Sequence, residues 1–451
     1  MRIKFNGDRD AGTLGVHLTF VLEKRYPLYE TLPGGGPPEL RRVSVEHITT
    51  TRAQVEEILE SIRDELEQLV SGLLEERASN LGMIEDVMKE RGSQLLLKVF
   101  QGVVRNSGAR KLEGEVGCGK CGDTAVSLGQ RAKRVHLTFG EVEIERGCYW
   151  CKGCSATWAP LDGQLGIDQS GRSPRLVEAM ALLGCELPFV PAAERLAQLC
   201  GVVVGSSQVE AVSEGIGRSL EAQQMAEMEA AFEKGELPDV ERTTPVVIVS
   251  MDGVMVPHRD GHHETKVAAI GGADPALKKE DEELRVEKWS YVTHTGDVGT
   301  FGSLAWMESY RQGVEEAQEV VVLGDGAAWI WALAEEHWPK AVQILDFWHA
   351  SEHLWSMGKA LFGEEDERVG PWVEVVKGRL RHGKIKEMIR QWGGLNARSP
   401  ELFNQELTYF SNQSARMNYP AYRQKGYPIG SGSVESANRH VVGVRVKQSG
   451  M

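Results

Sequence analysis

The sequence contains no long hydrophobic run. Nowhere does it show the roughly 18 consecutive uncharged apolar residues that a membrane-spanning helix requires, and its first residues lack the pattern of a secretory signal. Hydrophobic residues make up 41% and charged residues 26% of the 451 positions, as in water-soluble globular proteins. We therefore expect a cytoplasmic protein with about two to four folded units.

The sequence also lacks an excess of positive charge. Lys and Arg number 51 against 65 Asp and Glu, so the formal net charge is −14. Indiscriminate binding to nucleic acid needs many basic residues to pair with phosphates, so this balance argues against it for the chain as a whole. Two stretches are nevertheless strongly basic, 377–390 and 439–447, and each is either a solvated helix face or a contact for DNA. The candidate contact residues are Lys377, Arg379, Arg381, Lys384, Arg439, Arg445 and Lys447.

Cysteine is scarce and unevenly distributed. Five of the seven cysteines lie between Cys118 and Cys154, in a CxxC and a CxxCxxC arrangement. A disulfide framework would spread its pairs along a shorter, secreted chain, so metal binding is the better explanation. Between the two clusters, residues 134–150 alternate polar and apolar side chains around Gly140, which predicts a β-hairpin.

Two CxxC pairs joined by a hairpin place four thiolates at the corners of a tetrahedron, which is the geometry of structural zinc. We predict one Zn²⁺ ion in a zinc ribbon, with Cys148 as a spare or substitute ligand. An iron–sulfur cluster or a redox pair uses the same residue types and is the alternative. The predicted zinc ligands are Cys118, Cys121, Cys151 and Cys154.

The first hundred residues divide into two parts. Residues 1–50 mix charges with Gly and Pro and show no sustained period, so we expect a poorly structured leader. From 51 to 107, apolar residues recur at helical spacing between Glu and Arg, which predicts an amphipathic helical region. Its apolar stripe packs either on its own domain or on a helix of a second subunit.

A second helical region follows the cysteine-rich unit, which we place at 108–165. Residues 170–241 are predicted to form a helix, a turn at Gly201, a second helix capped by Ser206 or Ser207, and an acidic connector. This spacing suits a helix-turn-helix, whose second helix can enter the major groove of DNA, and it equally suits an ordinary αα-hairpin.

The last region, 242–451, changes to short apolar runs typical of strands. Three strands are followed by helix, strand, helix and strand, which is the element order of a ribonuclease H-like α/β sheet. A mostly helical, charged insertion at about 350–425 then precedes a last helix. The predicted strands are 246–253, 266–272, 287–295, 320–326 and 341–349, and the predicted helices between them are 303–318 and 327–338.

Two aspartates stand where predicted strands end. Asp252 and Asp325 each follow an apolar run and precede Gly, so in a sheet with neighbouring strands both side chains emerge at one edge. Hard cations such as Mg²⁺ or Mn²⁺ take oxygen ligands, and two such ions about 4 Å apart promote phosphoryl transfer. An isolated Asp-Gly pair also marks ordinary turns, so the aspartates alone do not establish a metal site.

Glu435 is a candidate for a third carboxylate. It falls in the first turn of a helix that we expect to begin near Ser433, after Gly430 and Gly432. A glutamate there also stabilises the positive end of the helix dipole, with Ser433 as the N-cap residue. From the residues alone, helix capping is at least as good an explanation as metal binding.

Three sequence blocks together carry a family resemblance: VVVLGDGAAWIW at 320–331, ILDFWHASEHLW at 344–355, and PIGSGSVESANRHVVGVRVKQSGM at 428–451. In this order, with the cysteine-rich unit before them, they resemble the ISKra4-type insertion-sequence transposases, relatives of the Mutator-like group. The resemblance implies a bacterial, nucleoid-associated DDE transposase that cleaves DNA and transfers strands with two Mg²⁺ or Mn²⁺ ions. Its partners would be double-stranded DNA at transposon ends and at the target, and further copies of itself.

The resemblance also assigns roles to residues. It implies Asp252, Asp325 and Glu435 as the metal-binding catalytic triad, and Asp346 and His349 as the DxxH block after the second acid. His349 either contacts a catalytic carboxylate or DNA, or belongs to the core. The tryptophans of these blocks either stack on unpaired bases or belong to the core. They are Trp329, Trp331, Trp348 and Trp355.

Members of that group continue well past the block that ends at Met451, so the resemblance implies a shortened final helix. The alternative function is therefore a truncated or catalytically inactive remnant that recognises transposon ends without cutting. A ribonuclease H-like nuclease unrelated to mobility is a third possibility.

Overall fold

The computed structural model describes residues 52–75, 80–106, 116–118, 120–258, 260–277 and 283–446. The predicted leader at 1–50 lies outside them. The chain divides into two compact units, and the described residues change from one unit to the other between Glu221 and Ala222. Helix α6 (Ser206–Lys234) contributes its first part to the amino-terminal unit and its last part to the carboxy-terminal unit.

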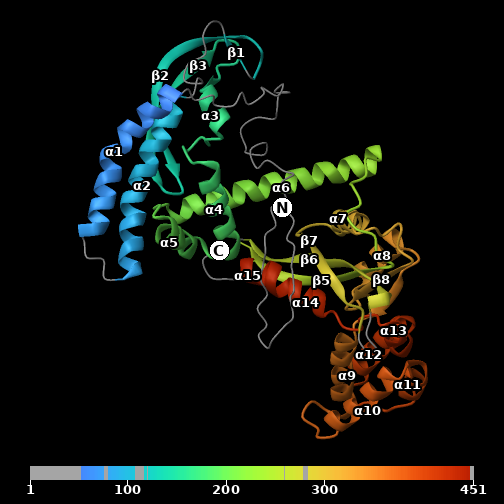
Figure 1. Cartoon of the computed structure of the whole chain (residues 1–451). Helices are drawn as coiled ribbons and strands as arrows, with labels where there is room; N and C mark the ends of the chain where they lie inside the picture. The colour runs from blue at the N-terminus through green and yellow to red at the C-terminus, as the bar shows by residue number, and fades with distance from the viewer. Residues whose placement is uncertain are drawn as a thin grey trace. The chain divides into compact units, whose positions relative to one another are not determined.

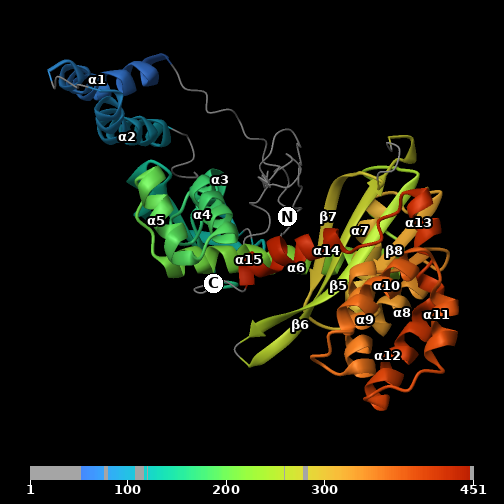
Figure 2. The same cartoon turned by 90° about the horizontal axis from the view of Figure 1, so that it is seen from below.

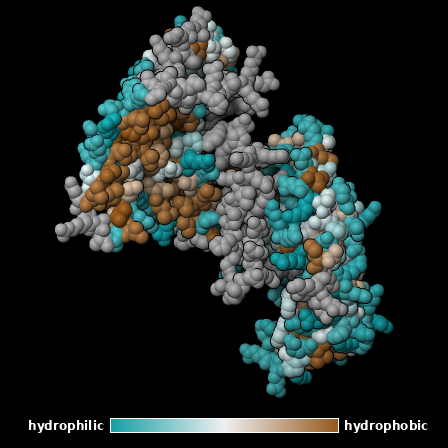
Figure 3. Space-filling view, viewed as in Figure 1, coloured by the Kyte–Doolittle hydropathy of each residue, from teal (hydrophilic) through white to brown (hydrophobic). Residues whose placement is uncertain are grey.

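The amphipathic region at the start of the amino-terminal unit forms two helices, α1 (Arg52–Glu75) and α2 (Leu81–Asn106), which pack against each other. Ile58, Ile62 and Leu69 on α1 are buried, so part of the predicted stripe packs within its own unit. Another part stays exposed, and Figure 3 shows an apolar surface over α1, α2 and α5 (Phe189–Cys200). Its exposed members on α1 are Val55, Leu59, Leu66, Val70 and Leu74.

The cysteine-rich segment folds as a four-stranded antiparallel sheet in the order β1-β2-β3-β4. The predicted hairpin is confirmed, because β2 and β3 pair along their length up to Leu137 and Gly140. Gly140 has φ 138°, and a side chain there would meet Leu97 of α2, so the turn requires glycine. The strands are β1 (Val116–Gly117), β2 (Thr124–Leu137), β3 (Gly140–Cys151) and β4 (Thr157–Trp158).

Three helices and the start of α6 complete this unit. Helix α4 begins at Pro174, where the Ser173 side chain accepts a hydrogen bond from the Leu176 N–H, and α5 ends at the left-handed Gly201. Ser206 and Ser207 lie inside the first turn of α6; the Gln208 side chain accepts from the Gly205 N–H instead. The predicted serine caps therefore lie one and two residues after Gly205, the residue that directly precedes the helix. The helices are α3 (Pro160–Leu165), α4 (Pro174–Glu186) and α5.

The carboxy-terminal unit is built on a five-stranded sheet in the order β7-β6-β5-β8-β9 (Figure 1). β5, β6 and β7 pair antiparallel, whereas β5, β8 and β9 pair parallel. The α/β class and the predicted order of strands and helices are confirmed. The strands are β5 (Val246–His258), β6 (Gly261–Ala273), β7 (Val286–His294), β8 (Glu319–Gly324) and β9 (Val342–Leu345).

Helices cover both faces of this sheet. Successive strand residues point to opposite faces, so Ala268 and Ile270, which share a core with α7 and α8, lie opposite Val267 and Ala269. The second pair packs under Val434 and Ala437 of α14, which lies along β5 and β6 (Figure 2). The helices are α7 (Val298–Arg311), α8 (Ala328–His337) and α14 (Gly432–Ala437), and a short 3₁₀ turn spans Pro275–Leu277.

The stretch between β9 and α14 is helical, as predicted, and its buried residues join the main core of the unit. Several boundaries differ from the prediction, and the first two strands form a longer hairpin than expected, with β5 ending at His258 and β6 beginning at Gly261. The helix expected at 303–318 begins and ends earlier, and the last strand stops at Leu345 because Asp346 caps the following helix. The helices are α9 (Phe347–Phe362), α10 (Val369–Arg381), α11 (Ile385–Trp392), α12 (Pro400–Gln413) and α13 (Tyr419–Lys425), with a 3₁₀ turn at Ser414–Arg416.

The end of the described chain departs from a regular α-helix. After α14, residues Asn438–Gly443 form a π-helix, and α15 (Val444–Val446) follows. Within the part of the chain that the structure describes, no helix is both long enough and apolar enough to cross a membrane.

Candidate functional site

Three aspartates stand where the parallel pairing of β5, β8 and β9 ends: Asp252 lies within β5, which continues to His258, and Asp325 and Asp346 directly follow β8 and β9. Met251 of β5 pairs with Gly324 of β8, and Gly324 pairs with Leu345 of β9. The next residue in each strand direction is Asp252, Asp325 or Asp346. Neighbouring strands are about 4.8 Å apart, so the register brings the three backbones side by side at one edge of the sheet.

Asp252 is held by two hydrogen bonds. The Gly253 N–H donates to Oδ1 at 2.7 Å, and Nδ2 of Asn438 donates to Oδ2 at 2.6 Å. Burial raises the pKa of Asp252, and the negative charge of Asp325 raises it further. The hydrogen bonds and the positive charge that His349 can carry lower it in part. The site therefore holds a carboxylate whose charge is costly without a nearby cation.

Asp325 is fixed by a tight loop between β8 and α8. Its Oδ1 accepts from the Ala327 N–H at 2.9 Å, and its backbone oxygen accepts from Oη of Tyr409 at 3.1 Å. Gly326 has φ 108°, and a Cβ there would lie 2.9 Å from that hydroxyl oxygen, so glycine is required beside the acid. Helix α12 therefore holds the loop that carries Asp325 in place through the hydrogen bond from Tyr409.

Asp346 has a structural part in the site. Its side chain is 1% exposed; Oδ1 accepts from the N–H groups of Trp348 and His349 at 2.5 and 2.7 Å, and Oδ2 accepts from the Ser431 N–H. The carboxylate therefore caps α9 and, through its bond to Ser431, fixes the position of the loop that leads into α14. All the hydrogen bonds that hold it come from backbone groups, so we interpret Asp346 as a positioning residue.

Removing this carboxylate should loosen both elements. We expect Asp346→Ala to lower the free energy of unfolding by at least about 2 kcal/mol, because three backbone N–H groups, one of them buried, lose their acceptor. Thermal denaturation measures the loss. Ser399→Ala at the start of α12, where the serine side chain makes no capping bond, is the control and should change stability by less than about 0.5 kcal/mol. Equal stability of the two variants would contradict the assigned role.

Glu435 lies on α14 and is exposed to solvent. Oγ of Ser431, the residue before the helix, donates to its Oε1 at 2.8 Å. The helix begins at Gly432, slightly before the predicted start, and Ser433 is in its first turn. The predicted N-cap Ser433 is therefore wrong: Ser431 holds that position, and its hydroxyl bonds Glu435 and no backbone N–H of the helix. Glu435 does lie in the first turn, as expected.

The structure does not bring the predicted carboxylate triad into one tight cluster. Among the described residues, the only set of three or more His, Cys, Asp or Glu with ligand atoms all within 4.8 Å of one another consists of cysteines. Asp252 and Asp325 share the sheet edge, and Glu435 lies one helical turn before Asn438, which contacts Asp252. The π-helix that directly follows α14 therefore contacts the edge through its first residue, Asn438.

His349 and the tryptophans divide between surface and core. The His349 side chain is 41% exposed, with Nδ1 3.6 Å from Glu352, so it is not a core histidine. Trp331 is buried, and Trp329 packs against the core. Trp348 and Trp355 lie two turns apart on the same face of α9. They are 53% and 42% exposed, so part of each ring is accessible to a binding partner.

The basic candidates are partly engaged within the chain. Nζ of Lys377 lies over the Trp348 ring, and Arg381 lies over the Phe347 ring. Arg379 pairs with Glu387 at 3.1 Å. Lys384 lines an open cavity of about 440 Å³, and Arg439 is exposed. Arg445 lies in α15, and Lys447 lies outside the described residues.

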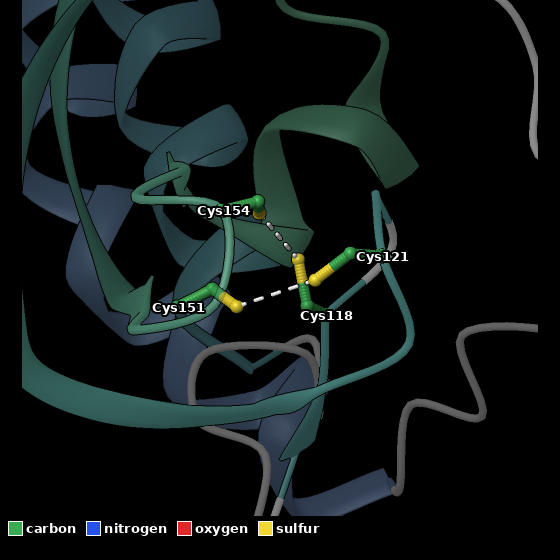
Figure 4. Close-up of side chains that lie close together, drawn as sticks. All are labelled: Cys118, Cys121, Cys151 and Cys154. Carbon is green, nitrogen blue, oxygen red and sulfur yellow. Dashed lines mark hydrogen bonds between the residues drawn. The ribbon is translucent and has the colours of Figure 1, made fainter.

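The four predicted zinc ligands meet at one end of the antiparallel sheet (Figure 4). Their sulfur atoms all lie within 4.8 Å of one another. Sγ of Cys118 is 3.5 Å from Sγ of Cys154, and Sγ of Cys121 is 3.5 Å from Sγ of Cys151. The cluster can hold a metal ion such as zinc, because four convergent thiolates match its tetrahedral preference.

The thiols of the cluster titrate differently. Desolvation by burial opposes ionisation of Cys118, but hydrogen bonds from the backbone N–H groups of Lys120 and Cys121 outweigh it and lower the pKa to about 7. Cys121 shows the opposite result: the Asp123 backbone lowers its pKa, but the neighbouring thiols raise it to about 12. Cys148 lies outside the cluster, with its sulfur 3.5 Å from the Arg146 guanidinium.

Sequence reasoning missed Asn438, Tyr409 and Ser431, which contact or position the acids. The spacing of Glu435 and Asn438 was a usable signal, since residues three apart share a helix face. Nothing in the sequence indicated that Tyr409, 84 residues from Asp325, would bind its backbone.

Comparison with protein families gives a match to the model of an uncharacterised protein family, UPF0236, over residues 126–360. The match covers more than half of the chain, from β2 into α9. It includes two of the clustered cysteines and all three aspartates at the sheet edge. No curated protein matches the chain.

Proposed function

The chain belongs to the uncharacterised protein family UPF0236, and we propose that it is a DDE-type transposase that cleaves and joins DNA at the ends of an insertion sequence. Members of this family are often found in insertion-sequence elements. The observation that carries the proposal is the parallel register that sets Asp252 and Asp325 side by side at one edge of the sheet. Further support comes from the contact between that edge and the helix bearing Glu435.

We propose that the carboxy-terminal unit is a ribonuclease H-like domain. Three antiparallel strands, two further parallel strands and the strand order β7-β6-β5-β8-β9 are consistent with that fold. The helices α9 to α13 stand between β9 and α14, where the proposed transposase family has its helical insertion. In this arrangement the insertion supports the site from one side, since Tyr409 of α12 binds the backbone of Asp325.

The residues present suit a divalent metal. Carboxylates are the oxygen ligands that Mg²⁺ and Mn²⁺ prefer, and the raised pKa of Asp252 reflects charge that a cation would stabilise. Two such ions, when bound, activate an attacking oxygen and stabilise the leaving oxygen of a phosphodiester. Asp252, Asp325 and Glu435 would hold them. Asn438 and Gly253 orient the Asp252 carboxylate, and Asp346 fixes the loop before α14.

The proposed reaction has two steps and no covalent protein intermediate. Water attacks a phosphodiester at the end of the element and releases a 3′-hydroxyl; this hydroxyl then attacks a phosphodiester of the target DNA. His349, half-exposed beside the edge, is placed to contact the DNA backbone or an acid. Lys384 and Arg439 are the basic candidates whose exposure suits phosphate contacts.

We propose that the amino-terminal unit recognises DNA. The four cysteines would hold one structural Zn²⁺ ion in a zinc ribbon, because a closed four-sulfur site leaves no position for substrate. α5 and the start of α6, joined at Gly201, would act as a helix-turn-helix. The chain carries more acidic than basic residues, so we expect DNA binding to depend on a few local phosphate contacts and to weaken only moderately as the salt concentration rises.

One observation favours the alternative of an inactive, DNA-binding remnant. Glu435 does not join Asp252 and Asp325 in a cluster within 4.8 Å. Sequencing the DNA that flanks the reading frame tests the two functions. Short terminal inverted repeats around an uninterrupted frame are expected for the transposase, whereas flanks without repeats would contradict a functional element.

Transposition of paired ends requires at least two copies, and we propose that α1 provides the contact. Val55, Leu59, Leu66 and Val70 form an exposed apolar row apart from the residues that face α2. We expect Leu59→Glu with Leu66→Glu to weaken self-association at least about tenfold, because each buries an unpaired charge in the contact. Sedimentation equilibrium measures this. Val375→Glu, at an exposed apolar site on α10, is the control; dimers unaffected by the α1 changes would exclude this surface.

A further inference from the structure

Asn438 joins the helix of Glu435 to the edge of the sheet. It is the first residue of the π-helix Asn438–Gly443 and lies one turn after Glu435. Its Nδ2 donates to Oδ2 of Asp252 at 2.6 Å. π-Helical turns are rare and frequently occur at functional sites. The backbone conformation at Asn438 and its contact with Asp252 therefore both indicate a functional role for this side chain.

The two ends of the Asn438 amide are in different situations. An ionised carboxylate only accepts hydrogen bonds, so the amide NH₂ faces Asp252 and the amide oxygen takes no part in that bond. That oxygen, Oδ1, is fully buried and has no hydrogen-bond partner. Buried polar atoms in folded proteins nearly always have a partner, so an unpartnered acceptor beside an acid indicates that a bound group completes it.

The chemistry of the missing partner is constrained. A carbonyl oxygen accepts hydrogen bonds or binds cations, and amide oxygens are regular ligands of hard divalent ions together with carboxylates. A neutral ligand adds an oxygen without adding negative charge to an edge that already holds Asp252 and Asp325. A cation bound by Asp252 therefore fits the unpartnered oxygen.

We propose that Oδ1 of Asn438 is a ligand of the divalent cation held by Asp252, so that one amide both orients the carboxylate and binds the ion. This inference rests on the proposed function, and it adds a neutral ligand to the three carboxylates. It explains why the contact from α14 to the sheet edge is made by an amide: an aspartate would repel Asp252, and an alanine would supply no oxygen.

Mn²⁺ binding to the full-length chain tests the proposal without any measurement of activity. The cysteine cluster is first loaded with zinc, and Mn²⁺ titrations are followed by calorimetry. Asp252→Ala defines the signal from the sheet edge. Asn438→Ala removes both functions of the amide, whereas Asn438→Asp keeps an oxygen and loses the donor to Asp252. Asn404→Ala, an exposed asparagine on α12, is the matched control.

We expect Asn438→Ala to weaken Mn²⁺ binding at least about tenfold, and Asn438→Asp to bind Mn²⁺ about as tightly as the wild type. At one Mn²⁺ concentration, the melting temperature of Asn438→Asp should rise about as much as that of the wild type and that of Asn438→Ala should rise less, because stabilisation by a ligand follows its affinity.

Two results would overturn the inference and leave the proposed function intact. Equal weakening in the Ala and Asp variants would mean that the amide only positions Asp252, and unchanged affinity in Asn438→Ala would exclude any part in binding. If the wild type bound no Mn²⁺, or if Asp252→Ala bound Mn²⁺ as tightly as the wild type, the proposed metal centre would be overturned, and this inference with it.

Discussion

Replacing Asp252 with asparagine is expected to lower the rate of metal-dependent DNA cleavage at least about 10³-fold and to leave binding to the element's ends unchanged. The loss follows from removing a metal ligand whose stabilisation of charge in the transition state amounts to several kcal/mol, and about 1.4 kcal/mol corresponds to tenfold in rate. Asp325→Asn and Glu435→Gln should have effects of similar size. Cleavage of labelled DNA ends and an electrophoretic binding assay measure the two quantities.

The fold should survive this substitution. Burial and Asp325 raise the pKa of Asp252 in the folded protein, so its carboxyl contributes stability only below its unfolded pKa and loses that contribution as pH rises through the folded value. At neutral pH, in the absence of metal, Asp252→Asn should therefore be at least as stable as the wild type. A loss of cleavage then reflects chemistry and not misfolding.

A matched control is an acid on the same unit that takes no part in the site. Glu401, exposed in the first turn of α12, is suitable, and Glu401→Gln should cleave at the wild-type rate. If Asp252→Asn cleaved as fast as Glu401→Gln, the carboxylate edge would not be the catalytic centre. If the wild type bound the ends and never cut, the inactive remnant would be the correct interpretation.

Loss of one clustered cysteine is expected to have the largest effect on stability. Cys151→Ser should abolish stoichiometric zinc and unfold the four-stranded sheet, because the energy of metal binding stabilises the fold directly. β2 and β3 have their own hydrophobic core, but the end of the sheet that carries the cysteines has little other support, since β1 and β4 are each two residues long. Elemental analysis of the purified protein and circular dichroism measure zinc content and folding.

Two serine substitutions serve as controls. Cys200→Ser, at a half-buried thiol on α5, and Cys148→Ser, whose sulfur faces Arg146, should both keep one zinc ion per chain. Full zinc content in Cys151→Ser would show that Cys148 or another group replaces it. Iron with visible absorption would show that the cluster holds iron and sulfur.

The sequence predicted those parts of the structure that depend on local pattern. Apolar runs located the strands β5 to β9, and the CxxC spacing identified the four cysteines that converge, because a two-residue bite and a hairpin are local features. The position of Asp325 followed from the end of a strand, and that of Asp252 from the end of an apolar run inside the longer strand β5. The placement of Glu435 relative to them did not, because it depends on how α14 packs over Val267 and Ala269.

What escaped prediction are contacts made over long sequence distances. Asp346 looked like a further acid of the site, yet its carboxylate is fully occupied by backbone N–H groups, one of them from Ser431. Tyr409 and Asn438 reach the edge from helices whose docking is a tertiary event. Such contacts arise from the packing of the main core, which joins residues from β5 to Ile429.

The most direct test of the central claim is to incubate the protein with DNA carrying the repeats that flank its own reading frame and to map every cut at nucleotide resolution. With Mg²⁺ or Mn²⁺, the account predicts cuts that release 3′-hydroxyls at the repeat boundaries, and no cuts in the presence of a chelator. Binding to the repeats without cuts in either metal, or cuts scattered without regard to the repeats, would contradict it.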